Sequence, residues 1–181
     1  MDAPIILTAL LDADTQRIAT DLRRRFFPPE RNYLTAHLTL AHHLPGERLE
    51  EIVAHARRVA ARQAVIPVYV RELIDLGKGT ALRVSTAPDR REIQPLVELR
   101  SALLAPFGRS LTVQDRRPFR RPHLTIQNKV DKATARALQR RLGRLFVPRA
   151  GRVEGIGVYA YRGGPWETLA RIRLGEPRKK P

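Results

Sequence analysis

Two short segments of the chain repeat one arrangement of polar and apolar residues. Residues 37–40 read His-Leu-Thr-Leu and residues 123–126 read His-Leu-Thr-Ile, so the two segments lie 86 residues apart. In a β-strand alternate side chains share a face, and each histidine therefore lies beside its threonine while the apolar residues face the other way. Each segment can present one imidazole and one hydroxyl group to the same site.

A pair of imidazoles is suited to acid–base chemistry at phosphorus. If the two strands meet, one of His37 and His123 removes a proton from the nucleophile and the other protonates the leaving oxygen. The hydroxyl groups of Thr39 and Thr125 can donate to the non-bridging phosphate oxygens as negative charge builds there. Neither segment has the carboxylate cluster that Mg²⁺ prefers. We therefore predict a catalytic site that needs no metal ion and no cofactor.

A single His-x-Thr motif in a strand is usually structural. Here the elements around the two motifs recur in the same order, and this recurrence favours a functional role. The predicted helices after the two motifs begin about 84 residues apart, and segments 80–84 and 168–172 have similar sequences 88 residues apart. Recurrence in the same order indicates a duplicated unit. The predicted ranges are one bilobal domain at 1–175, with repeat halves at about 5–86 and 80–174, and a basic tail at 176–181.

Apolar periodicity predicts an α+β protein. The first helix is expected to be capped by Asp12 or Asp14 and to carry Ile18, Leu22 and Phe26 on one face. Short apolar or β-branched runs between turn residues predict the strands. The predicted strands are 5–11, 34–44, 65–76, 80–86, 123–130, 153–161 and 168–174, and the further predicted helices are 47–63, 93–104 and 132–145.

Charge distinguishes the composition of this chain. Its 181 residues include 34 lysines and arginines against 18 acidic residues, a net charge of +16, which favours a polyanionic partner such as a nucleic acid or a nucleotide. The absence of cysteine excludes disulfides, thiol catalysis and zinc sites with cysteine ligands. No segment has the features of a signal peptide or the length of a membrane span, so we expect a cytoplasmic protein.

Three segments carry a resemblance to a known family. They are Ala36 to Leu40, the run Arg-Pro-Phe-Arg-Arg-Pro-His-Leu-Thr-Ile at 117–126, and Gly-Pro-Trp at 164–166 before the last predicted strand. A phenylalanine shortly before Pro-His-x-Thr is typical of the two-histidine phosphoesterase superfamily. Over nearly its whole length the chain resembles the group of 2′-5′ RNA ligases and RNA 2′,3′-cyclic phosphodiesterases in that superfamily.

The resemblance implies a fold, a reaction and roles for the histidines. The fold is a bilobal α+β fold in which two antiparallel sheets face a central cleft and the helices pack outside. The reaction is the metal-independent opening of a 2′,3′-cyclic phosphate to a 2′-phosphate, and the same motifs can serve reversible 2′-5′ joining of RNA. His37 would be the acid for the leaving 3′ oxygen and His123 would activate the water, although the pseudo-symmetry allows the two roles to be exchanged.

Further residues are candidates for substrate contacts. Lys129 shares the expected strand face of His123 and Thr125, together with Gln127, and can reach a substrate phosphate. Arg120 and Arg121 precede the second motif and are expected at the cleft mouth, where they can also be ordinary surface charge. The aromatic candidates for stacking on a base are Tyr33 and Tyr161, with Tyr159 and Trp166 as further aromatic residues.

The other histidines are expected to have no catalytic role. On the alternation of a regular strand, His43 shares the face of His37 and lies at the rim, whereas His42 faces the other way. A metal site made of these three histidines would need ligands on opposite faces, so none is expected. His55 is predicted to be a solvated residue on a polar helix face.

Two alternative functions remain open. The same site could act on a small cyclic nucleotide or an ADP-ribose cyclic phosphate, with the loop at 109–119 setting the substrate range. The charge alone would also fit a non-catalytic RNA-binding module, but such a module has no need of two His-x-Thr motifs. Because the duplication completes the site within one chain, we expect a monomer.

Overall fold

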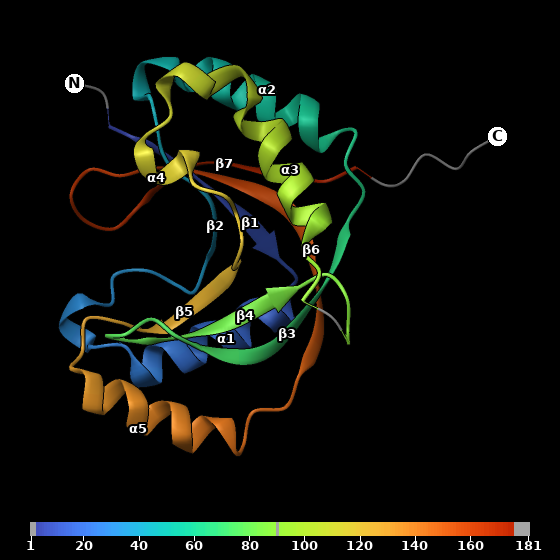
Figure 1. The fold of residues 1–181 in the computed structure, drawn as a ribbon. Coiled ribbons are helices and arrows are strands. Elements are labelled where there is room, and N and C mark those ends of the chain that lie inside the picture. The colour runs from blue at the N-terminus through green and yellow to red at the C-terminus, as the bar shows by residue number, and fades with distance from the viewer. Residues whose placement is uncertain (1–2, 90, 176–181) are drawn as a thin grey trace.

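The structure is a computed structural model that describes residues 3–89 and 91–175, and Figure 1 shows its α+β architecture. Its strands are β1 (Ile5–Leu11), β2 (Leu38–Leu44), β3 (Ile66–Asp75), β4 (Thr80–Ser85), β5 (His123–Gln127), β6 (Arg149–Ala160) and β7 (Glu167–Arg173). Its α-helices are α1 (Ala13–Phe26), α2 (Leu49–Ala60), α3 (Gln94–Leu104), α4 (Val113–Arg116) and α5 (Lys132–Gly143). The predicted α+β class is confirmed, and the two facing sheets that the resemblance implied are the two halves of one continuous sheet.

The strands of the described residues form one antiparallel sheet that curls on itself. Its order is β2-β1-β6-β3-β4-β5, and β7 pairs with β6 outside this path. Strand β6 joins the two lobes because it pairs with β1 through residues 153–160 and with β3 through residues 149–153. The sheet curls so far that its end strands β2 and β5, which carry the two motifs, come into contact.

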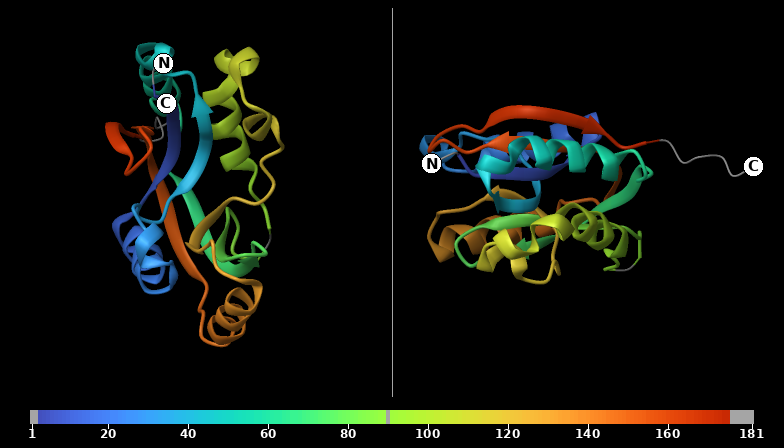
Figure 2. Two further views of the ribbon diagram at one scale, coloured as in Figure 1. Left: turned by 90° about the vertical axis from the view of Figure 1, so that its left-hand side faces the viewer. Right: turned by 90° about the horizontal axis from the view of Figure 1, so that it is seen from above.

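Helices cover the outside of both lobes. Helices α2 and α3 pack together on the lobe of β1, β2 and β7, whereas α1 and α5 pack on the lobe of β3, β4 and β5, as Figures 1 and 2 show. Helical spacing of apolar residues explains the attachment, since it gives each helix one buried face. The buried residues are Ile52, Ala56 and Ala60 in α2 and Ala135, Leu138 and Leu142 in α5.

Helix α1 differs from its prediction in the face that it buries. Its N-cap is Asp12, whose carboxylate accepts a hydrogen bond from the backbone N–H of Thr15 at 3.0 Å, as one alternative predicted. The residues of the expected apolar face, Ile18, Leu22 and Phe26, are only half-buried. The fully buried side chains are instead Thr15, Ala19, Thr20 and Arg23. Small and polar residues face inward because this helix packs closely against β5 and donates hydrogen bonds there.

Two largely buried arginines support the motif strands. Arg23 of α1 donates from Nη1 to the carbonyl oxygen of Thr125 in β5 at 3.0 Å. Arg100 of α3 donates from Nε to the carbonyl oxygen of Leu40 in β2 at 2.8 Å. Each arginine therefore connects a helix that covers one lobe to the backbone of that lobe's motif strand, at the motif threonine or next to it.

The sheet corrects one part of the repeat analysis. Segments 80–84 and 168–172 have similar sequences, but β4 pairs with β3 and β5 whereas β7 pairs with β6. Strand β4 pairs with the motif strand β5, just as β1 pairs with the motif strand β2. Within the two lobes, β4 therefore corresponds to β1 and not to β7. The division of the chain into two repeats itself stays a prediction.

The segment before the second motif contains the short helix α4, which was not among the predicted helices. The predicted tail at 176–181 lies outside the described residues. Among the helices of the described residues, none combines the length and the apolar character needed to cross a membrane.

Candidate active site

The motif strands β2 and β5 carry the same irregularity. Thr39 lies opposite Thr8 of β1, but the next β1 residue, Leu7, lies opposite Ala41, so Leu40 is an extra residue. In β5 the pairing steps in the same way, past the extra residue Ile126. Such a β-bulge reverses the alternation of side chains beyond it. The two motif residues that precede each bulge still share the inner face of the sheet.

The two motif histidines are held in the same way. Nδ1 of His37 lies 2.8 Å from the carbonyl oxygen of Thr35, and Nδ1 of His123 lies 2.7 Å from the carbonyl oxygen of Arg121. A carbonyl oxygen only accepts hydrogen bonds, so each Nδ1 carries the proton and donates. Each Nε2 is left free to exchange a proton with a substrate.

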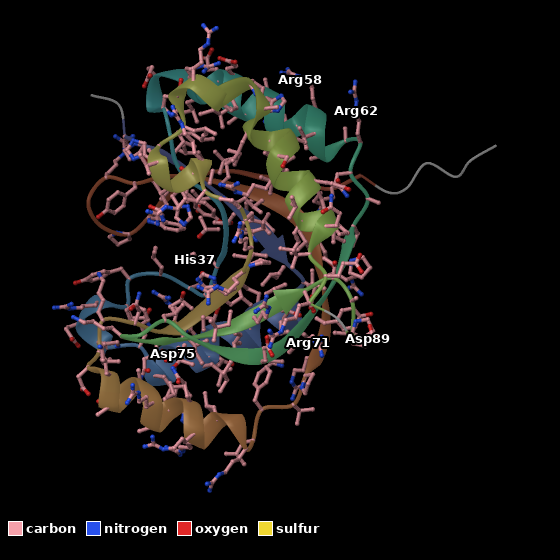
Figure 3. The ribbon with its side chains drawn as sticks, in the orientation of Figure 1. His37, Arg58, Arg62, Arg71, Asp75 and Asp89 are labelled. Atoms are coloured by element: carbon pink, nitrogen blue, oxygen red, sulfur yellow. The ribbon has the colours of Figure 1, made fainter. Side chains whose placement is uncertain are left out.

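The four motif side chains line one cavity. A cavity of about 180 Å³ is bounded by His37, Thr39, His123 and Thr125, and by residues 118–122. The curl of the sheet brings the two pairs together, as the repeated motifs predict, and Figure 3 shows His37 between the two lobes. Arg120 and Arg121 are also among the lining residues.

Two further hollows adjoin this cavity. One, of about 360 Å³, shares the four motif residues and extends to Tyr161 and Trp166. The other, also of about 360 Å³, passes from His37 and Trp166 along Tyr33, Tyr159 and Arg171. Both predicted stacking residues, Tyr33 and Tyr161, therefore border a hollow beside the histidines. We call the second hollow the aromatic groove.

Gly157 packs closely against two side chains that line the aromatic groove. A Cβ atom at this position would lie 2.5 Å from the ring of Tyr159 and 2.9 Å from Oγ1 of Thr8. Both neighbours line the groove, so a larger residue would displace its wall. Glycine here keeps the groove open beside His37.

Trp166 covers the first motif histidine. Its ring lies against that of His37 with centroids 4.5 Å apart, and it also contacts Tyr159 at 5.7 Å. Burial lowers the pKa of His37 to about 4, against the opposing effect of its hydrogen bond to Thr35. Electrostatic interactions with Arg23, His42 and His123 lower this pKa further. His37 is therefore a neutral imidazole at pH 7.

The prediction that His42 faces away from the site is wrong. His42 lines the 180 Å³ cavity and the hollow that reaches Trp166, whereas His43 is exposed and lines neither. The physical reason is the bulge at Leu40, since Leu40 and Ala41 are both buried and the alternation reverses there. His37, Thr39 and His42 thus share the inner face of β2.

A buried carboxylate that the sequence analysis missed holds His42. The side chain of Asp115 in α4 is 0% exposed, and its Oδ1 lies 3.1 Å from Nδ1 of His42. The same carboxylate accepts the backbone N–H groups of His42 and His43, each at 2.9 Å. Burial alone would raise the pKa of Asp115, but these hydrogen bonds lower it overall, so the group is ionised.

A short sequence pattern around Asp115 could have indicated the helix that carries it. Thr112 caps α4 by accepting from the backbone N–H of Asp115 at 3.2 Å, and the carboxylate of Asp115 accepts from the hydroxyl of Thr112 at 3.3 Å. A threonine three residues before an acidic residue is a typical start of a helix. The pattern predicts the short helix but not its partner strand.

Two predicted positions beyond the second motif are also wrong. Gln127 is buried beyond the bulge, where it faces Thr80. Lys129 follows the end of β5 with a φ of 61° and is exposed, and it does not border the cavities that His123 lines. The bulge and the early end of β5 separate both residues from the face of His123.

His55 also differs from its prediction as a solvated residue. Its Nε2 lies 2.8 Å from the carbonyl oxygen of Ala102, and its ring packs edge-on against Phe107 at 6.0 Å. It therefore connects α2 to α3. Within residues 3–89 and 91–175, no three histidine, aspartate or glutamate side chains stand together as a metal site would require.

The chain is similar to a known protein family and to several solved structures. Residues 11–165 match the 2′-5′ RNA ligase superfamily. A phosphoesterase crystal structure matches with a TM-score of 0.67 and 21% identity over 97% of this chain and 100% of that chain. Escherichia coli LigT complexed with 3′-AMP matches with a TM-score of 0.65 and 20% identity over 96% of this chain and 99% of that chain.

The protein TT0787 of Thermus thermophilus matches with a TM-score of 0.64 and 17% identity, over 96% of this chain and 98% of that chain. Among curated protein sequences, none matches this chain. The structural matches establish that the whole chain shares one fold with these proteins.

Proposed function

The chain belongs to the 2′-5′ RNA ligase superfamily and is an enzyme of the phosphoesterase or ligase type, and we propose that it opens 2′,3′-cyclic phosphate ends of RNA or oligonucleotides. One observation carries this proposal. His37 and His123 each have Nδ1 engaged by a backbone carbonyl and line one cavity together with Thr39 and Thr125. Two imidazoles and two hydroxyl groups around one phosphate meet the needs of an acid–base displacement.

The proposed reaction is an in-line hydrolysis. Nε2 of His37 takes a proton from water, and the water oxygen forms a bond to phosphorus. The bond from phosphorus to the 3′ oxygen breaks, and Nε2–H of His123 gives its proton to that oxygen. The products are a 3′-hydroxyl and a 2′-phosphate. Thr39 and Thr125 donate to the non-bridging oxygens during the displacement.

This assignment exchanges the two roles that the family resemblance implies. A general acid must carry a proton on the nitrogen that faces the leaving oxygen. With a pKa of about 4, His37 has a single ring proton at neutral pH, and that proton is on Nδ1, so Nε2 has none to give. A neutral imidazole whose Nδ1 donates to Thr35 presents a lone pair at Nε2, as a general base requires. We therefore assign the base to His37 and the acid to His123.

The aromatic groove supports a nucleotide substrate. It begins at His37, has the aromatic rings of Tyr33, Tyr159 and Trp166 along its walls, and includes Arg171. Aromatic rings stack on bases with little regard to sequence. Structures of E. coli LigT hold 3′-AMP, NADP⁺ or ATP. A groove of this size also fits a small cyclic nucleotide, which is the second candidate substrate.

The test compares two substrates under identical conditions. We expect turnover of a cyclic-ended oligonucleotide and of 2′,3′-cyclic AMP, with the 2′-phosphate as product in ³¹P NMR and with full activity in EDTA. A preference for the oligonucleotide supports the RNA substrate, and a preference for the mononucleotide supports the second candidate. Absence of turnover on both, or activity that needs added Mg²⁺ or Zn²⁺, would refute the proposal. Joining would need a 5′-hydroxyl group to replace water as nucleophile, so it is measured with a second RNA end present.

A further inference from the structure

The two lobes differ in the residue that follows each motif bulge. His42 lies three residues after Thr39, and Asn128 lies three residues after Thr125. The side-chain oxygen of Asn128 accepts a hydrogen bond from the backbone N–H of Lys129 at 2.8 Å. Asn128 does not border the cavities that His42 lines. The site therefore has a third imidazole on the side of β2, and Asn128 does not supply a counterpart on the side of β5.

The third imidazole has a different partner at Nδ1. His37 and His123 face neutral carbonyl oxygens, whereas His42 faces the ionised carboxylate of Asp115. A carboxylate fixes the proton on Nδ1 and stabilises a positive charge on the ring, as in the aspartate–histidine pairs of hydrolases. A third imidazole held in this way can donate from Nε2 while its charge is balanced.

We propose that His42 is a third substrate-contacting imidazole, which donates from Nε2 to a non-bridging phosphate oxygen while Asp115 fixes its ring. This inference rests on the proposed function and names a further binding group for the same phosphate. Its position supports it, since His42 lines both cavities that contain His37 and His123. Its side chain is 45% exposed although Asp115 beside it is fully buried, so a substrate can reach the ring.

Charged groups lie on several sides of the His42 ring. Asp115 is also near Arg100, whose Nη2 lies 3.9 Å from Oδ1, so the carboxylate lies between this guanidinium and the imidazole of His42. The other titratable or charged groups that border the cavities of His42 are His37, His123, Arg120, Arg121 and Tyr161. Electrostatic interaction with His42 is one of the smaller causes that lower the pKa of His37. The same ring would thus hold the phosphate close to the proposed base.

The test uses His42→Ala with His43→Ala as its matched control, because the side chain of His43 lies on the same strand but outside the site. For His42→Ala we expect kcat/KM on 2′,3′-cyclic AMP to fall on the order of 10–10³-fold, as after loss of one oxyanion donor. Competitive inhibition by inorganic phosphate should weaken roughly tenfold, since a charge-assisted hydrogen bond is lost. The melting temperature should stay within a few degrees of wild type, and His43→Ala should match wild type in all three.

A spectroscopic measurement separates a direct contact from a structural effect. In ¹⁵N-labelled wild-type protein, inorganic phosphate should move the Nε2 resonance of His42 toward the range of a protonated ring. Asp115→Asn should abolish this response if the variant folds; if it does not fold, the wild-type titration and His42→Ala decide the question.

The two proposals fail separately. Unchanged phosphate inhibition in His42→Ala, together with an unmoved His42 resonance at saturating phosphate, would overturn the role of His42 even if cyclic AMP is hydrolysed. A phosphate response of His42 without any turnover would overturn the proposed reaction and leave His42 as an anion-binding group.

Discussion

The indole ring of Trp166 lies tilted against the imidazole ring of His37, with centroids 4.5 Å apart and planes 49° apart. Trp166 lies at the end of the loop between β6 and β7, so a late segment of the chain covers a histidine that precedes β2. Burial is the largest cause of the low pKa of His37, and the ring of Trp166 is one of the groups packed against the imidazole. The loop between β6 and β7 therefore contributes to the environment of the proposed base.

Replacement of Trp166 by alanine should shift the pH dependence of turnover. The proposed base works only when neutral, so in wild type kcat/KM should fall on the acid side near pH 4. Water that enters in Trp166→Ala should move this fall toward the ordinary histidine value of 6.5. Trp166→Phe keeps a ring over His37 and should stay closer to wild type. An unchanged acid limb in Trp166→Ala would contradict this account of the pKa.

The same burial should make folding stability depend on pH. The pKa of His37 is about 4 in the folded protein and 6.5 for an ordinary histidine, so between these values the unfolded chain binds a proton that the folded chain does not. The free energy of unfolding should therefore decrease as the pH falls from 6.5 to about 4. Urea titrations of wild type and His37→Asn at pH 7 and pH 4 measure this. The loss should be smaller in the variant, and equal losses would exclude His37 as the source.

The two motif histidines should fail as one unit. His37→Ala and His123→Ala each remove a proton-transfer partner, and each should lower kcat by roughly 10²–10⁴-fold. The double variant should lose less than the product of the single losses, because both imidazoles act on one transition state. Steady-state turnover of 2′,3′-cyclic AMP measures all three.

The control for this series is His43→Ala, whose side chain is exposed on the same strand and lines neither cavity of the motif histidines. It should keep wild-type turnover. Near-normal kcat in either single motif variant, on well-folded protein, would show that the motifs are scaffold and would favour the RNA-binding alternative.

The motif threonines should contribute less than the histidines. Thr39→Val and Thr125→Val keep the shape of the side chain and remove its hydroxyl donor. Each should lower kcat on the order of 10–10³-fold, by analogy with the loss of one oxyanion donor. Thr→Ser at the same positions restores the hydroxyl and should restore most of the activity. A valine variant with unchanged kcat would mean that its hydroxyl does not reach the phosphate.

Sequence patterns predicted the parts of the fold that depend on neighbouring residues. Strand β1 at Ile5–Leu11 and helix α3 at Gln94–Leu104 follow from apolar runs and helical spacing, and both lie where they were expected. The pairs His37–Thr39 and His123–Thr125 were found because each pair lies before its bulge. Alternation therefore still describes their faces correctly.

The features that the sequence patterns did not predict depend on pairing between distant segments of the chain. The extra residue at Leu40 appears only when β2 is aligned with β1, so regular alternation exchanged the faces of His42 and His43. The contact of Asp115 with His42 spans 73 residues of sequence. No sequence pattern within the strand reveals the bulge, and none within the helix reveals this contact. Both can be recognised only when the distant segments are seen paired in the folded protein.

Arg23 gives the sharpest test of how the helices support the site. Its side chain is buried, and its guanidinium donates to the side-chain oxygen of Asn32 at 2.9 Å and to the carbonyl oxygens of Leu34 and Thr125, each at 3.0 Å. It thereby holds the segment that leads to His37 and the backbone of the second motif at once. Burial lowers its pKa to about 10, so it remains charged at neutral pH.

Arg23→Met keeps much of the apolar stem but leaves these three oxygen atoms without their donor. Since an unsatisfied buried acceptor costs about 1–3 kcal/mol, we expect the free energy of unfolding to fall by roughly 2–4 kcal/mol. Turnover should also fall, because both motif segments lose a common anchor. Arg24→Met is the matched control: Arg24 is 71% exposed and its ion pair with Asp21 lies on the surface, so the change should stay within about 0.5 kcal/mol. Equal stability of the two variants in urea titrations would mean that Arg23 does not support the motif strands, and that the sheet alone holds the two histidines together.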